Sequence, residues 1–105
     1  MELKDVKGFL ESLNQDYVTF DPHFYKRSKE RPISEGMIRD FLSQTSKLEE
    51  IERGRGKDRF KLWFKMSKKY SLVVIIEIII EINPKGLKVI SAWNSDRKWQ
   101  NQLKQ

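Results

Sequence analysis

The sequence predicts an α+β fold in which about three helices pack on a four-stranded antiparallel β-meander. Two observations predict it. Apolar residues recur at helical spacing before residue 43, whereas from Leu48 onward they alternate with polar residues or run continuously, as they do in strands. A chain of 105 residues is long enough for one compact core but not for two. We therefore expect a single domain over residues 1–105, with an N-terminal helix at 1–14 and an α+β core at 20–99.

The first predicted helix is amphipathic. Its apolar residues lie three or four positions apart, and the polar residues 14–16 end it. These apolar residues are Leu3, Val6, Leu10 and Leu13. A short extended piece at 17–20 follows.

Two further helices are predicted from their first residues. Asp21 is well placed as an N-cap and Pro22 as the first helical residue, so a helix begins there and carries His23 in its first turn. Pro32 should end this helix, because proline disfavours the helical conformation in the residue before it. Ser34 can cap the next helix. The apolar stripe of that helix consists of Met37, Ile38, Phe41 and Leu42.

Residues 59–66 predict a strand with one wet, basic face. Apolar and polar residues alternate there, which is the period of two expected of a half-buried strand. The polar face carries Arg59, Lys61, Trp63 and Lys65. The segment 54–57, rich in glycine, is expected to be the basic hairpin tip that joins this strand to the one before it.

The last part of the chain predicts two more strands and a short helix. Residues 70–82 are nearly all β-branched, which favours a central strand. A turn at 83–86 leads to the next strand at 87–93. Residues 94–96 can cap a final short helix. That helix would hold Arg97, Lys98, Trp99 and Leu103.

The composition excludes several classes of chemistry. Without cysteine there is no disulfide framework, no cysteine-based zinc site and no thiol nucleophile, and a single histidine excludes a histidine-rich metal site. We therefore expect no metal and no cofactor. The N-terminus lacks the pattern of a signal peptide, and the most hydrophobic stretch is too short for a membrane helix, so a cytoplasmic protein is expected.

Positive charge is concentrated in one part of the sequence. The chain carries a net charge of +6, and residues 53–69 hold eight basic residues against only Asp58, a net of +7. Such a cluster favours a polyanion, with nucleic acid first and an acidic protein or anionic lipid behind it, although a solvated lysine-rich surface is the alternative. The residues expected to bind nucleic acid are Arg31, Arg53, Arg55, Lys57, Arg59, Lys61, Trp63 and Lys65.

Two tryptophans of the predicted strands have two interpretations each. Beside cations, an indole can serve as a platform on which a base stacks, but an indole is also an ordinary core or edge aromatic. Trp93 is assigned to the core. Trp63 is left open between the two interpretations, because it is flanked by cations on the predicted wet face.

His23 shares a predicted helix face with fixed positive charge. Arg27 and Arg31 follow it by four and eight residues, so in a helix the three would lie one above another. A group that titrates near neutral pH beside arginines suits phosphate chemistry. The alternative is a solvated or capping histidine.

The order of these motifs resembles the RelE/ParE superfamily of small toxins, and more closely the BrnT-type toxins and the DUF4258 family. The matching pieces lie between residues 20 and 99. They are Phe20–His23 leading into Arg27, Glu30–Glu35, Leu72–Val74, and Lys88–Trp93 followed by Asp96 and Arg97. The resemblance implies a small antiparallel sheet with helices on one side. The superfamily that the chain resembles includes metal-independent ribonucleases, gyrase poisons and members of unknown activity, so the implied fold is compatible with several functions.

The expected function is therefore a toxin-like, metal-independent endoribonuclease. Cleavage of RNA without a metal needs a base, cations for the developing phosphorane charge and an acid. His23 would be the base or acid, with Arg27 and either Arg59 or Arg97 as the electrostatic clamp. Glu30 or Asp96 could orient an arginine, but Glu30 also fits a surface charge and Asp96 a helix cap.

Two other functions remain open. One is a non-catalytic module that binds nucleic acid, with RNA favoured over DNA. The other is a protein-interaction module, such as the partner of an acidic antitoxin.

Overall fold

A computed structural model describes residues 1–28 and 31–98 and has an α+β fold, as the sequence predicts. The helices are α1 (Val6–Glu11), α2 (Pro22–Ser28) and α3 (Glu35–Leu42). The strands are β1 (Val18–Phe20), β2 (Leu48–Arg53), β3 (Arg59–Lys65), β4 (Tyr70–Ile79) and β5 (Gly86–Asp96). Short 3-10 turns, η1 (Leu3–Asp5), η2 (Gln15–Tyr17) and η3 (Thr45–Lys47), precede α1, β1 and β2.

The sheet has five strands in the order β1-β5-β4-β3-β2. The antiparallel meander of β2 to β5 agrees with the prediction, but the prediction of a purely antiparallel, four-stranded sheet is wrong. Strand β1, expected only as an extended piece, pairs in parallel with β5, with Val18 opposite Leu87 and Phe20 opposite Val89. A strand of three residues is too short to show a period in the sequence, so its pairing could not be predicted.

Local capping determines where α2 and α3 begin. The Asp21 carboxylate accepts a hydrogen bond from the backbone N–H of His23 at 2.8 Å. The Ser34 hydroxyl accepts one from the N–H of Met37 at 3.2 Å. Both predicted caps are therefore confirmed, since each satisfies an N–H that has no partner within the helix.

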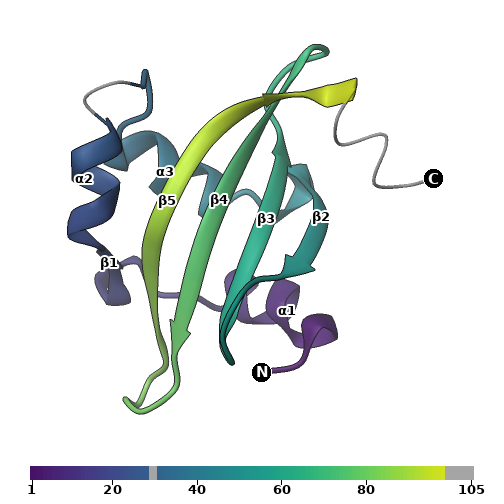
Figure 1. The fold of residues 1–105 in the computed structure, drawn as a ribbon. Helices are drawn as coiled ribbons and strands as arrows, with labels where there is room; N and C mark the ends of the chain where they lie inside the picture. The colour runs from purple at the N-terminus through teal and green to yellow at the C-terminus, as the bar shows by residue number, and fades with distance from the viewer. Residues whose placement is uncertain (29–30, 99–105) are drawn as a thin grey trace.

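The helices cover one face of the sheet. Phe60, Leu62 and Phe64 of β3 are fully buried there and belong to one hydrophobic cluster with residues of α1, α2 and α3. Figure 1 shows α3 behind the sheet and α2 beside β5. The opposite face, which we call the open face, carries the residues that alternate with this core, including Lys61 and Trp63.

Strand β5 is longer than predicted. It continues to Asp96, so the residues expected as a helix cap are the end of a strand. Of the final helix that the sequence predicts, the described part consists of Arg97 and Lys98, which are helical. The Asp96 carboxylate still accepts a hydrogen bond from the N–H of Lys98 at 2.9 Å, as a cap does. The other residues of the predicted helix, Trp99 and Leu103, lie outside the described residues, as does Glu30.

Within residues 1–28 and 31–98, no helix is long and apolar enough to cross a membrane.

Candidate nucleic-acid interface

Two indoles lie on the open face, with one strand between them. Trp63 of β3 is opposite Val73 of β4, which is in turn opposite Trp93 of β5. Val73 is fully buried although it is on the face that the helices leave uncovered. Strands are spaced at roughly 4.8 Å, so the two tryptophans are anchored roughly 10 Å apart with Val73 between them.

Cations lie over both indoles. The Lys61 Nζ is 4.9 Å from the centroid of the Trp63 ring and 5.5 Å from that of Trp93. The Arg31 guanidinium is 5.9 Å from the Trp93 centroid, and its Nη1 donates a hydrogen bond of 2.7 Å to the Ala92 carbonyl. Each such contact contributes about 0.5–2 kcal/mol, depending on how far the cation is removed from water. Arg31, Trp93, Lys61 and Trp63 therefore form a continuous row, which we call the indole-cation row.

Glu52 holds one end of this row in place. Its Oε2 accepts a hydrogen bond from the Trp63 Nε1 at 2.6 Å and lies 3.9 Å from the Lys61 Nζ. The hydrogen bond satisfies the indole N–H and fixes the orientation of the ring.

The structure favours one of the two interpretations left open for Trp63 and differs from the core assignment of Trp93. Trp63, expected on a wet face, is only 4 % exposed, so it presents no ring surface on which a base could stack. Trp93, assigned to the core, is half-buried on the open face and lies outside the main core cluster. The sequence pattern gives the face of a strand residue but not how far its neighbours cover it.

The basic run at 53–69 does not form one surface. Arg53 donates hydrogen bonds to the carbonyl oxygens of Met1 at 2.9 Å and Lys57 at 3.0 Å, so it fastens the N-terminus to the hairpin tip. Arg59 is ion-paired with Glu77 at 3.1 Å. Of the residues expected to bind nucleic acid, these two arginines are therefore engaged within the protein itself.

The exposed cations of this run lie at opposite ends of β3. Arg55 and Lys57 are exposed in the hairpin between β2 and β3, and Lys65, Lys68 and Lys69 are exposed at the other end of β3. Strand β3 has seven residues and so extends over roughly 23 Å. The indole-cation row is on the open face between the two ends.

His23 and Arg27 are exposed, one helical turn apart on α2. Arg97 is far from the start of α2 and therefore from His23. The Asp21 N–H binds the Val89 carbonyl, so α2 begins beside Val89, and Arg97 follows eight residues later, roughly 26 Å along an extended strand. The three residues expected to act together in catalysis are thus not brought together.

Arg97 is instead part of an ion pair. Its Nη1 and Nη2 donate to the two carboxylate oxygens of Glu49 at 2.6 and 3.2 Å, and this hydrogen bonding raises the pKa of Arg97. The pair connects the end of β5 to β2, the strand at the far edge of the sheet. This geometry indicates a structural role for Arg97.

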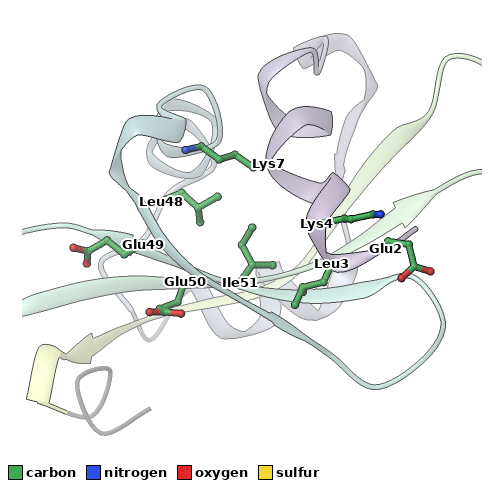
Figure 2. A pocket seen from close by; sticks show the side chains of 8 residues that line it. All are labelled: Glu2, Leu3, Lys4, Lys7, Leu48, Glu49, Glu50 and Ile51. Carbon is green, nitrogen blue, oxygen red and sulfur yellow. The ribbon is translucent and has the colours of Figure 1, made fainter. Parts of the chain in front are cut away.

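Another groove of the described structure is lined by none of the predicted site residues. It has a volume of about 600 Å³ and lies between the N-terminal turns and β2. Figure 2 shows Leu3, Leu48 and Ile51 in its wall, with charged side chains such as Lys7 and Glu50 around it. Within the described residues, no three side chains of the types that bind metals lie together.

Comparisons with models of protein families, with curated proteins and with solved structures find no match to this chain. The resemblance to RelE/ParE-like, BrnT-type and DUF4258 proteins therefore stays a prediction.

Proposed function

We propose that this protein binds single-stranded RNA on the open face of its sheet. The observation that carries the proposal is the indole-cation row, in which Trp93 is half-buried and lies beside Arg31 and Lys61. Proteins that bind single strands combine the same parts, an aromatic platform for the base and cations for the backbone.

In RNA binding, the tryptophan and the cations of the indole-cation row would have different roles. A base stacks on Trp93, while Arg31 and Lys61 turn from the indole toward the phosphates on either side. Single strands fit this arrangement better than duplexes, because their bases are free to splay out onto an aromatic side chain. The net charge of +6 attracts any polyanion and so supports the proposal only in general terms.

The test is the affinity of the protein for a labelled RNA oligonucleotide of mixed sequence. Trp93→Ala should weaken binding by about 5- to 150-fold, since stacking of a base contributes about 1–3 kcal/mol. Tyr70→Ala is the matched control: Tyr70 is an exposed aromatic at the start of β4, outside the row, so its loss should change affinity by less than two-fold. Equal binding by wild type and Trp93→Ala would refute the proposal.

Competition distinguishes RNA from an acidic protein partner. If the protein binds acidic chains through charge alone, polyglutamate should displace RNA and bind wild type and Trp93→Ala equally well. Under the proposal, polyglutamate at the same charge concentration competes poorly, because it has no base to stack on Trp93. Single-stranded DNA of the same sequence then tests whether the sugar matters.

A metal-independent ribonuclease is the second candidate function. It is favoured by one observation, the exposure of His23 and Arg27 one turn apart on α2, which places a titratable group beside a fixed cation. Purified protein would cut RNA in the presence of a chelator, and His23→Ala would lose cutting while its RNA affinity stays unchanged. Intact RNA after incubation with wild type would reject this candidate and leave the binding proposal in place.

A further inference from the structure

The surroundings of the Lys61 ammonium have the composition of a cation-binding cage. Its Nζ lies 4.9 Å from the Trp63 ring centroid, 5.5 Å from the Trp93 centroid and 3.9 Å from the Glu52 carboxylate. Two indoles and one carboxylate thus surround a single positive charge. Sites that recognise quaternary ammonium groups are built from aromatic rings in the same way, because the ring faces attract a cation without hydrogen bonds.

The walls of this cage are fixed by contacts that do not involve Lys61. The Trp63 Nε1 donates to Glu52 at 2.6 Å, and Trp63 is only 4 % exposed. Trp93 is on β5 opposite the fully buried Val73, and the Arg31 guanidinium lies 5.9 Å from its ring centroid. Removal of the Lys61 side chain would therefore leave two ordered indoles and a carboxylate around an empty space.

The cage has an opening to solvent. The Lys61 side chain is 32 % exposed and that of Glu52 is 39 % exposed, so a small cation can reach the site from the open face. The site should discriminate between cations by how strongly water hydrates each of them. A quaternary ammonium or a guanidinium is weakly hydrated and loses little on leaving water for an aromatic surface, whereas Na⁺ is compact and strongly hydrated.

We propose that Trp63, Trp93 and Glu52 form a cage for alkylammonium and guanidinium groups, and that Lys61 is its built-in occupant. In the wild-type protein Lys61 competes with any external cation, because it is tethered to the site at a high effective concentration. A ligand of this class, such as a guanidinium carried by a partner, binds when Lys61 leaves. The proposal does not depend on RNA binding, since it concerns a small cation and not a nucleic acid.

The experiment is a titration of Lys61→Ala with tetramethylammonium chloride, with sodium chloride at equal ionic strength as the reference salt. The readout is the NMR signals of the indole N–H groups of Trp63 and Trp93. We expect saturable shifts of both signals in Lys61→Ala, with half-saturation at a concentration at least ten-fold lower than in wild type. Guanidinium chloride below denaturing concentrations should give the same pattern, and sodium chloride should give no saturation.

Lys88→Ala is the matched control. Lys88 is on β5 opposite Glu77, between two core residues, so its side chain is on the open face in another row of the sheet. This variant removes one positive charge from the same face and should titrate as wild type does. Trp93→Leu in the Lys61→Ala background removes one wall and should abolish saturation.

Two results would overturn the proposal: linear, unsaturated shifts in Lys61→Ala, or the same half-saturation in Lys61→Ala and wild type. Lys61→Thr serves as a second variant, because threonine is also too short to reach the indoles and favours a strand. The thermal unfolding of each variant is measured first, so that loss of fold is not mistaken for loss of binding. A cage that binds tetramethylammonium in a protein that does not bind RNA would leave this inference standing and reject the proposed function.

Discussion

Trp63 and Trp93 lie on the same face of the sheet, yet their surroundings give them different roles. Trp63 is buried and its indole N–H donates a hydrogen bond to Glu52, which gives it a structural role. Trp93 is half-buried beside Arg31 and Lys61, which makes it available to a ligand. The sequence has a tryptophan in each of the two strands, with cations close to Trp63, but it does not contain the exposed area of each ring, which depends on the neighbouring strands.

Arg97 is predicted to contribute to stability. Arg97→Ala removes two hydrogen bonds to the Glu49 carboxylate and should lower the free energy of unfolding by about 1.5–3 kcal/mol. Arg97→Lys keeps the charge but loses the bidentate geometry, so it should be intermediate. Urea denaturation measures both, with Lys68→Ala as the control at an exposed cation. An unchanged midpoint in Arg97→Ala would contradict the structural role.

Tyr25 is predicted to titrate at an unusually high pH. Its hydroxyl donates a hydrogen bond to Glu35, and this bond raises the pKa of Tyr25 above its ordinary value. The folded state therefore holds the phenol proton more tightly than the unfolded state. The contribution of this group to stability is fully present below about pH 10 and is lost as the pH rises through the pKa of the folded state.

A spectrophotometric titration of phenolate tests this prediction. In Glu35→Gln the acceptor loses its charge, so the titration midpoint of Tyr25 should move down toward the ordinary value. Tyr25→Phe identifies which part of the absorbance change belongs to this residue. The same midpoint in wild type and Glu35→Gln would show that Glu35 does not cause the shift.

At the scale of elements, short-range signals predict where helices begin and long-range contacts decide how strands pair. Asp21 and Ser34 accept hydrogen bonds from N–H groups two and three residues ahead, so the sequence alone is sufficient to locate them. The pairing of β1 with β5 joins Val18 to Leu87, which are far apart in the chain. No local pattern contains that information.

Gly86 is predicted to be needed where β1 meets β5. A Cβ at this position would lie 3.1 Å from the Tyr17 carbonyl oxygen and 3.1 Å from the Ile82 Cδ1, so a larger residue would push the backbone before β1 away. Gly86→Ala should lower the free energy of unfolding by about 1–3 kcal/mol, as overpacking does.

Gly8→Ala is the control, for which we expect the opposite change in the free energy of unfolding. Gly8 is in α1, where an added Cβ would meet no atom within 4 Å, so alanine should stabilise the helix by about 0.5–1 kcal/mol. Thermal unfolding of the two variants beside wild type makes the comparison. If Gly86→Ala is as stable as wild type, β1 can move away from the added Cβ without lowering the free energy of unfolding.

At the scale of the whole molecule, folding divides a basic run that is continuous in the sequence. Part of it is bound within the protein, as with Arg59 and Glu77, and the exposed cations are at the two ends of β3. The indole-cation row on the open face combines residues from β3, β5 and the segment after α2. The most basic segment of the sequence and the centre of the candidate interface are therefore different places.

This division predicts that the effect of the hairpin cations depends on RNA length. The double variant Arg55→Ala/Lys57→Ala should bind a four-nucleotide RNA within two-fold of wild type, because such a ligand occupies only the indole-cation row. Its affinity for a 20-nucleotide RNA should fall, and the slope of log affinity against log salt should decrease by about 0.7 for each phosphate that the variant no longer neutralises. Fluorescence anisotropy at several salt concentrations measures both. An equal reduction in affinity for the short and the long RNA would place the hairpin inside the interface.

The sequence by itself determined the α+β class, the two capped helix starts, the antiparallel meander and the basic character of the chain. These follow from periodicity, capping and composition, which act over a few residues or are sums over the chain. Only the tertiary structure decided the parallel pairing of β1, the burial of Trp63, the separation of Arg97 from His23 and the meeting of Lys61 with two indoles. Each of these depends on which strands become neighbours, and that depends on how the whole apolar surface is buried against the helices.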